Sequence, residues 1–382
     1  MLLRLVSGLL LAALVLAGRA AAQSPDAALS ARWDAVCTGA APSGPLAARC
    51  AEIFAGGPGS RDIAATGNFL GEIPGQGRAA TRDGAPDDGD LRSDLGAGWS
   101  VFLSADAGRL RRRDGVNESP FDGDTGALSA GVDWAPRPAW RLGLLLNHTR
   151  DDLDFTLSQG STRTRYTGLM GLVGWSLTDQ LSLDGYAGSL RGDYRLRRAI
   201  AYRLPSSVSV ASVASASADA DRDLAGLGLN WSLPAGAWEW QLGAGLDWQR
   251  TQIDPYRETG GAGLALFVPG RAITSRRGRL DAALSRSISA NWGVWQPLLR
   301  LGWRHEFANP ARPLGVSFLE DANGTQVVFD TDDADTGWGE AGVGAVFVFT
   351  GGHSAFVEYR QRFGHDFLQE RLLSVGWRME LP

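Results

Sequence analysis

Two histidines stand beside carboxylates in an arrangement that could support acid–base chemistry. His148 precedes Asp151 and Asp152 by three and four residues, and His305 directly precedes Glu306. A carboxylate that orients an imidazole can help it to activate a water molecule for hydrolysis. Neither pair has a nucleophile motif beside it, and the chain contains no Gly-x-Ser-x-Gly elbow. We therefore predict that the chain is not an enzyme, and we interpret both histidines as polar residues near strand ends.

Four aspartates form a second candidate site. Asp330, Asp332, Asp333 and Asp335 supply the oxygen ligands that calcium prefers. The glycine and the terminal glutamate of an EF-hand loop are missing, so calcium binding is the alternative to a solvated acidic loop. We favour the acidic loop, and we predict neither a metal ion nor a cofactor.

The first residues of the chain have the pattern of an export signal. Residues 1–22 combine Arg4 with an apolar core from Val6 to Leu16 and with small residues at Ala20–Ala22, which is the pattern of a cleaved signal peptide. The apolar core is shorter than the ~20 residues that a spanning helix needs, so a retained anchor helix is the weaker alternative. The mature chain is expected to leave the cytoplasm.

A short helical region is predicted to follow the signal. Residues 23–75 form the predicted helical N-terminal segment, with helices over 24–36, about 45–54 and 61–73. Residues 76–95 are rich in Gly, Asp, Arg and Pro, which is typical of a linker.

The only two cysteines lie in this segment, at Cys37 and Cys50. In an oxidising periplasm, a pair this close in sequence favours a disulfide over a metal site. Two ligands alone would not hold zinc. The disulfide would join the first two predicted helices as a hairpin.

The last residues of the chain carry the clearest structural pattern. Between Arg371 and Leu381, apolar Leu373, Val375 and Trp377 alternate with polar residues, which is typical of a strand with one apolar face. An open strand of this kind would invite aggregation in a soluble protein. It suits the closing strand of a barrel whose apolar face is covered by lipid.

Twelve such strands are predicted within residues 96–382. They are placed at 96–112, 125–135, 139–156, 161–178, 181–198, 222–233, 237–252, 271–289, 293–309, 336–350, 353–363 and 371–381. Tight turns alternate with longer connections, as in outer-membrane barrels with short periplasmic turns and external loops. The longer connections, predicted to be external loops, are residues 114–124, 199–221, 253–270 and 310–335. Residues 206–218 are small, so the second of these loops is predicted to be flexible. A soluble β-sandwich, the alternative, does not explain this alternation.

Outward-facing tryptophans are predicted to mark the two membrane interfaces, because indole rings lie favourably between hydrocarbon and water. Trp238 and Trp248 are ten residues apart on one face. That separation is about 33 Å of strand, or about 25 Å of membrane thickness at a tilt near 40°. The predicted girdle residues are Trp134, Trp140, Trp231, Trp238, Trp240, Trp248, Trp303 and Trp377.

Charged residues have two predicted roles, and the net charge of −5 argues against nucleic-acid binding. Arg111, Arg112 and Arg113 are predicted to contact lipopolysaccharide phosphates, because the guanidinium fork suits that anion. Ordinary rim charge is the alternative. A second group should face the lumen and pair internally, or with a helix of the N-terminal segment. Its members are Arg300, Arg304, Glu306, Glu358, Arg360, Arg378 and Glu380.

The end of the chain resembles an autotransporter β-domain. The stretch Ala355–Gly364, followed by Gln369 and Leu373–Arg378, carries the resemblance. Earlier segments agree with it, at 126–134, 140–147, 166–175 and 181–188. The resemblance covers residues 96–382 and implies a twelve-stranded type V secretion translocator, inserted by the barrel assembly machinery, with a helix threading the lumen. Such barrels usually end in an aromatic residue, whereas this chain ends in Leu381 and Pro382.

We therefore expect an all-β fold, a twelve-stranded antiparallel transmembrane β-barrel preceded by a short helical segment. We expect a monomer in the outer membrane of a Gram-negative bacterium, with residues 60–95 in its lumen and no large passenger ahead of it. Its expected partners are outer-membrane lipid, lipopolysaccharide and the barrel assembly machinery. The alternative is a free-standing narrow pore or structural barrel, with the helical hairpin folded in the periplasm.

Overall fold

The computed structural model describes residues 35–37, 44–55, 64–65, 98–115, 117–156, 160–203, 209–310 and 312–381. The predicted signal peptide and linker lie outside the described residues, as does most of the first predicted helix. Helix α3 (Gly44–Ala55) falls where the second helix was predicted.

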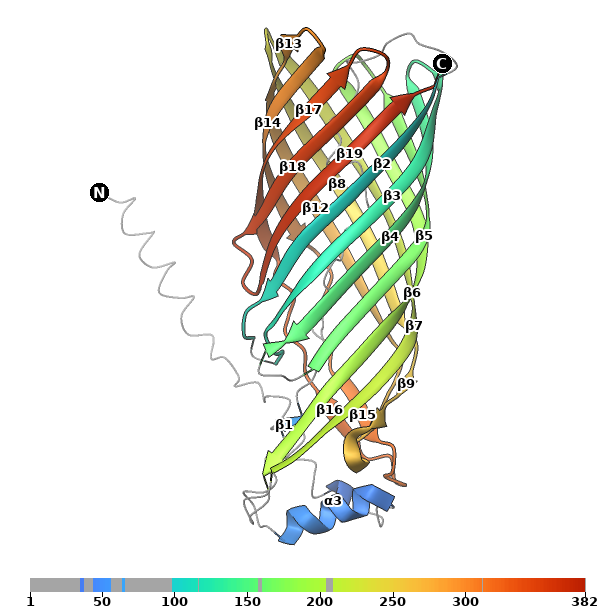
Figure 1. Ribbon diagram of the computed structural model, residues 1–382, viewed down its shortest axis with the longest axis vertical. Coiled ribbons are helices and arrows are strands. Elements are labelled where there is room, and N and C mark those ends of the chain that lie inside the picture. The colour runs from blue at the N-terminus through green and yellow to red at the C-terminus, as the bar shows by residue number, and fades with distance from the viewer. Residues whose placement is uncertain are drawn as a thin grey trace, which may run out of the picture.

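Twelve long antiparallel strands form a closed barrel, as predicted (Figure 1). They are β2 (Trp99–Arg112), β3 (Phe121–Arg137), β4 (Trp140–Phe155), β5 (Gly160–Ser176), β6 (Leu181–Arg203), β7 (Ser209–Ala235), β8 (Trp238–Ile253), β12 (Arg271–Arg286), β14 (Gly293–Glu306), β17 (Gly337–Phe349), β18 (His353–Phe363) and β19 (Leu368–Glu380). A three-residue strand, β13 (Ile288–Ala290), extends the pairing with β14. The wall closes because β19 returns to β2, from Leu368 opposite Arg112 to Glu380 opposite Ser100. The apolar alternation at the chain end therefore belongs to a strand paired on both sides.

The two ends of the barrel differ in their connections. At the end that we call the short-turn end, brief turns such as residues 236–237 and 350–352 join the strands, and Trp99 and Leu381 lie together, with Leu381 N–H donating to the Trp99 carbonyl. At the opposite end, the long-connection end, residues 254–270 and 307–336 join the strands. In Figure 1 the C-terminus lies at the top, and α3 lies at the bottom beyond the long-connection end.

The predicted loop at 199–221 is wrong over most of its length. β6 and β7 continue as one hairpin, with unbroken pairing from Leu181 opposite Trp231 to Arg203 opposite Ser209. The Ser- and Ala-rich tract within this region therefore belongs to β7 from Ser209 onward. Small side chains lack an apolar alternation, but they do not prevent backbone pairing when a neighbouring strand supplies the ladder.

Two further predicted loops contain a second, four-stranded sheet, in the order β16 (Gln326–Phe329), β15 (Leu314–Phe318), β11 (Leu266–Val268), β9 (Tyr256–Arg257). A short 3-10 helix, η5 (Gly261–Gly263), lies next to it in the chain. β10 (Thr259–Gly260) pairs instead with β7. The prediction of plain loops is wrong here because strands of two to five residues give too few alternations to stand out in sequence.

The N-terminal segment also contributes a strand to the wall. β1 (Ala64–Ala65) pairs with Ile200 and Ala201 near the end of β6. The helix predicted over 61–73 is therefore wrong at these two residues, whose backbone is extended along the edge of the long hairpin. The segment thus touches the long-connection end at two places, through α3 and through β1.

Candidate functional site

The lumen wall near the short-turn end is built from paired charges. Arg378 donates to Asp133 at 2.8 Å and to the Ser100 hydroxyl at 2.7 Å. On the facing wall, Arg279 lies 3.6 Å from Asp184 and 3.9 Å from Asp247. These residues face inward because strand geometry alternates them with outward apolar residues such as Trp134.

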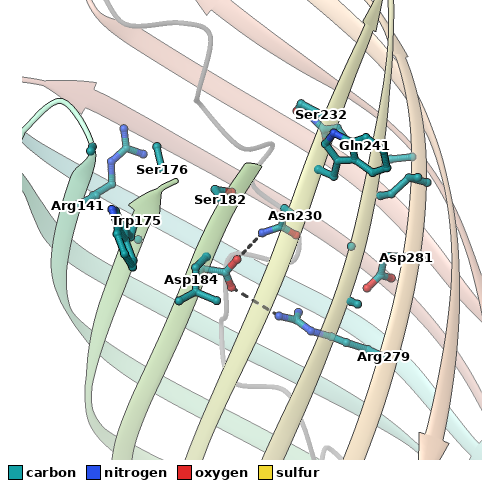
Figure 2. A pocket seen from close by; sticks show the side chains of 18 of the residues that line it. Arg141, Trp175, Ser176, Ser182, Asp184, Asn230, Ser232, Gln241, Arg279 and Asp281 are labelled. Carbon is teal, nitrogen blue, oxygen red and sulfur yellow. Dashed lines mark hydrogen bonds and ion pairs between the residues drawn. The ribbon is translucent and has the colours of Figure 1, made fainter. Parts of the chain in front are cut away.

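Figure 2 shows this part of the wall, where Asn230 approaches the Asp184 carboxylate from the neighbouring strand β7 and Arg279 approaches it from β12. The cavity beside them has a volume of about 120 Å³, with Arg141, Gln241 and Asp281 also in its lining. Its lining combines guanidinium, carboxylate and amide groups, which suit a polar chain or water better than an apolar ligand.

All seven charges predicted to face the lumen lie at inward positions of their strands. Five of them contact side chains of other strands: Arg300, Arg304, Glu306, Glu358 and Arg378. Arg300 pairs with Glu358 at 3.1 Å, and this carboxylate is 1% exposed. Arg304 pairs with both Asp281 at 2.8 Å and Glu340 at 3.1 Å. The members of this group are thus partly paired with carboxylates that the prediction did not name.

The missed partners are Asp133, Asp281 and Glu340. Each alternates with outward residues on its own strand, and Asp133 stands between outward Val132 and Trp134. Extending the alternation test from the last strands to every strand would have found them.

Glu306, another predicted lumen residue, lies nearer the long-connection end. Its carboxylate accepts hydrogen bonds from the Ser275 hydroxyl at 2.5 Å and from the Arg276 backbone N–H at 2.8 Å. It fixes the end of β14 against β12 and is 8% exposed.

The long-connection half of the lumen is apolar, unlike the half just described. Side chains of the four-stranded sheet, including Leu266, Val316 and Phe329, form one buried cluster with inward residues of the wall such as Leu196 and Ile253. Burial of this kind stabilises the sheet against the wall by about 25 cal/mol per Å² of apolar surface. We call the four-stranded sheet together with η5 the cap.

One buried ion pair ties the cap to β6. The Arg198 guanidinium donates to both carboxylate oxygens of Glu258, at 2.9 and 2.6 Å, and to the Leu264 carbonyl at 2.7 Å. Glu258 also accepts from the Leu266 backbone N–H at 2.9 Å. The side chains are 2% and 0% exposed, so the charges are balanced without water.

Helix α3 docks on the outer surface of the cap. The Leu46 backbone N–H donates to Glu320 at 2.6 Å, and the Leu46 side chain is fully buried. At Gly263, which has φ +93°, a β-carbon would lie 2.5 Å from the Pro45 carbonyl carbon, so only glycine fits under the helix.

Cys37 and Cys50 are joined by a disulfide, with 5.6 Å between their α-carbons. Val36 and Cys50 are buried in the same apolar cluster as the cap. The disulfide therefore fixes residues 35–37 to α3 at the place where both contact the barrel, and it requires the oxidising environment that an exported chain meets.

The outer face of the barrel is apolar across its middle. All eight predicted girdle tryptophans point outward, with exposed fractions from 36% for Trp140 to 49% for Trp303. Trp99 and Trp175 are outward as well, and they stack on Trp134 and Trp140 at ring-centroid distances of 5.7 and 5.1 Å. Leucines such as Leu301, 62% exposed, fill the band between the tryptophans.

The predicted lipopolysaccharide contact is wrong for one residue of three. Arg112 is 6% exposed and points inward, where it pairs with Glu118 at 3.1 Å and with Asp332 at 2.6 Å. Arg111 and Arg113 are exposed. Successive residues of a strand point to opposite faces, so three consecutive arginines cannot all meet the lipid.

Neither candidate acid–base pair is assembled. His148 points outward and contacts the Thr167 hydroxyl at 2.8 Å, whereas Asp151 points inward to Thr125 and Thr164. His305 stacks outside between Trp303 and Phe307. Glu306 and Asp151 are on the inner face, so strand alternation separates them from the two histidines. Asp152 shares the outer face with His148 but pairs with Arg150 and with Arg163, the latter at 3.5 Å.

The four aspartates do not converge on a cation. Asp332 is held by Arg112, and Asp335 accepts from the Asp366 backbone N–H at 2.7 Å. Within the part of the chain that the structure describes, no three His, Cys, Asp or Glu side chains gather as a metal site. None of the described helices is long and apolar enough to cross a membrane.

His365, in the connection between β18 and β19, is the fourth histidine. Its Nδ1 accepts from the backbone N–H groups of Phe367 and Leu368, at 3.3 and 3.1 Å. Burial lowers its pKa to about 3, and Arg362 adds to this effect while Asp335 opposes it. It is therefore a neutral acceptor that shapes the last connection at the long-connection end.

A closed antiparallel barrel with an apolar outer band and a charged lumen defines the class of transmembrane β-barrels. The Autotransporter beta-domain family model matches residues 101–360, and the chain belongs to this family. Its members are transport and secretion domains, and membership implies the outer membrane of a Gram-negative bacterium. No curated protein matches the chain.

Two solved structures show the same fold. The translocator domain of the autotransporter NalP from Neisseria meningitidis is 16% identical, with a TM-score of 0.54, over 76% of this chain and 90% of that one. The β-domain of the Bordetella autotransporter BrkA is 20% identical, with a TM-score of 0.53, over 74% of this chain and all of that one.

Proposed function

We propose that this autotransporter-type barrel stands in the outer membrane, holds the chain between Ala65 and Gly98 in its lumen, and presents the disulfide-bonded helix α3 outside the cell. One observation carries the proposal. Ala64 and Ala65 pair with β6 at the long-connection end, whereas Trp99 begins β2 at the short-turn end. The residues between them must join opposite ends of the barrel.

Residues 66–97 are numerous enough to span the barrel from one end to the other. From Leu181 to Ala201 along β6 is about 66 Å, or about 50 Å along the barrel axis at a tilt near 40°. Residues 66–97, if extended, reach about 105 Å. The segment can therefore run the length of the barrel with chain to spare.

The route through the lumen is favoured over a route along the outside. Residues 66–97 include Asp83, Asp87, Asp88, Arg78 and Arg82. Charged and irregular backbone is not tolerated in hydrocarbon, but it is tolerated where it lines or fills an aqueous cavity. The wall of paired arginines and carboxylates near the short-turn end offers such a segment complementary partners.

The cap supports a closed barrel rather than a free-standing pore. The apolar cluster joins the cap to the inner wall, and α3 lies on its outer surface. In this proposal the barrel is not an enzyme, because Asp151 and Glu306 lie on the face opposite to the histidines and Asp152 pairs with arginines instead of His148. Barrel assembly machinery would insert it through β19, where outward Leu373, Val375 and Trp377 provide the apolar face.

Cysteine labelling on intact cells tests the placement of α3. A membrane-impermeant maleimide should label an Ala51→Cys variant, since Ala51 is exposed on α3. The Gln180→Cys variant, exposed in a turn at the short-turn end, should react only after the cells are permeabilised. Bonded Cys37 and Cys50 do not react. If Ala51→Cys also needed permeabilisation, the periplasmic-hairpin alternative would hold and the proposal would fail.

A further inference from the structure

An arginine groove lies on the outer face of the barrel, where β19, β2 and the start of the β2–β3 connection meet. Arg109, Arg111, Arg113 and Arg371 line a hollow of about 630 Å³, together with Gln369 and the carboxylates Asp114 and Asp122. The register sets Arg371 directly opposite Arg109, and Gln369 opposite Arg111. Four guanidinium groups are thus brought together by two neighbouring strands.

The level of this groove coincides with the edge of the apolar band that faces the long-connection end. On β2 the outward residues run from Trp99 through Leu103 and Ala107, and then change to Arg109 and Arg111. Trp99 and Arg109 are ten residues apart, about 25 Å of barrel height, which is the thickness of the apolar band of such barrels. The headgroup layer of the outer leaflet begins at this height.

The protein balances only part of the charge of the groove, since five arginines and two aspartates line it. Arg109 pairs with Asp122, but Arg111, Arg113 and Arg371 have no carboxylate partner among the described residues. Like charges that face one another across a strand pair are destabilising. A bound anion would supply the counter-charge that Arg111, Arg113 and Arg371 lack.

Arginines elsewhere on the same rim differ in this respect. Arg195 pairs with Asp193 at 2.8 Å, Arg163 with Asp152 at 3.5 Å, and Arg191 with Asp221 at 3.8 Å. These three side chains are also exposed, so exposure alone does not distinguish the groove. The difference is the missing carboxylate.

We propose that the arginine groove binds a phosphate group of an outer-leaflet glycolipid, lipid A, with Arg111, Arg113 and Arg371 as its ligands. Guanidinium groups bind phosphate through paired N–H donors, and they keep their charge in a lipid headgroup layer. The acyl chains of the same lipid would lie on the apolar band, on the side of the groove toward the short-turn end, along Leu103, Leu373 and Val375. The inference rests on the barrel standing in the outer membrane.

The test is a titration of the purified full chain in detergent with lipid A, with bound lipid counted by native mass spectrometry. The triple variant Arg111→Gln/Arg113→Gln/Arg371→Gln should bind at least about tenfold more weakly than wild type. The matched control, Arg163→Gln/Arg191→Gln/Arg195→Gln, loses the same charge and should stay within about twofold of wild type. A lysine triple at the three groove positions should fall between these results, because it keeps the charge but not the fork.

Two further arms identify the ligand. Dephosphorylated lipid A should bind wild type and the groove variant equally, and millimolar inorganic phosphate should not displace lipid A. Equal binding of phosphorylated lipid A by wild type and the groove variant would overturn the proposal, as would an equal loss in the control variant. Displacement by inorganic phosphate would assign the groove to a soluble anion instead.

Gel mobility without heating shows whether each variant is folded. If the glutamine triple variant does not fold, the lysine triple variant provides the comparison with wild type. The titration does not depend on where α3 lies, so its failure is separable from failure of the labelling experiment.

Discussion

The two halves of the lumen are filled by different kinds of side chains. Near the short-turn end, guanidinium and carboxylate groups such as Arg378 and Asp133 are paired but partly solvated, with exposed fractions of 16% and 9%. Near the long-connection end, a small sheet packs against the wall as a protein core, and the ion pair that ties it to β6, Arg198–Glu258, is dry. The half near the short-turn end can therefore exchange its partners with water or another polar group, while the other half is a fixed closure.

Removing the charge of Arg198 should destabilise the protein most, and it tests the difference between the two halves of the lumen. Arg198→Met leaves Glu258 buried without its cation, so it should destabilise the folded state by about 3–5 kcal/mol. Arg378→Met should cost about 1 kcal/mol, because water and other groups can replace its contacts. Unfolding midpoints in urea, read by gel mobility, measure both. The double variant Arg198→Met/Glu258→Leu should recover most of the loss. Equal costs for the two single variants would remove the distinction between the halves.

Reduction of the disulfide should come next in size and should affect only one end. Cys37 and Cys50 close a loop with a sequence separation of 13 residues, and such a bridge contributes about 3 kcal/mol. Reduction with dithiothreitol should expose α3 to protease while the barrel keeps its folded mobility. The Cys37→Ser/Cys50→Ser variant should behave the same way without reductant. Loss of the folded barrel on reduction would show that α3 holds the wall itself.

The smallest effect is a pH dependence at the long-connection end. The folded pKa of His365, about 3, lies below its unfolded value near 6.5, so the unfolded chain binds the extra proton between these pH values. Stability is therefore full above pH 6.5 and falls as the pH drops towards 3, by about 2 kcal/mol at pH 5. His365→Asn, whose amide oxygen can accept the same N–H groups, should show a flatter profile. Parallel profiles for the two proteins would mean that His365 does not titrate as described.

The barrel can be predicted well from the sequence because each strand shows its alternating pattern within its own residues. Period-two alternation in stretches such as residues 238–248 identifies a strand and its outward face without any knowledge of its neighbours. The β6–β7 extension is missed for the opposite reason, since Ser and Ala side chains mark neither face. The alternation of Leu314, Val316 and Phe318 is visible in sequence, but at five residues it is too short to identify a strand with assurance.

Some of the functional residues could likewise be predicted from local alternation, and others could not. The inward direction of Arg300 or Glu358 follows from alternation, and the same rule would have separated Arg112 from Arg111. The Arg198–Glu258 pair could not be predicted, because it joins residues 60 positions apart through a fold of the cap that no local pattern reveals. The docking of α3 on Gly263 likewise depends on contacts between distant parts of the chain.

The pairing of β19 with β2 has a consequence for the order of assembly. Most neighbouring strands are joined by a hairpin or a single connection, but this seam unites Ser100 with Glu380, about 280 positions apart. Closing so long a loop costs more conformational entropy than forming any hairpin, and non-local pairings form slowly. Until the final strand has been made and has found the first one, the growing sheet has two bare edges that can pair with other chains. The seam thus makes completion of the wall the last event in folding, and it leaves the unfinished sheet dependent on protection until then.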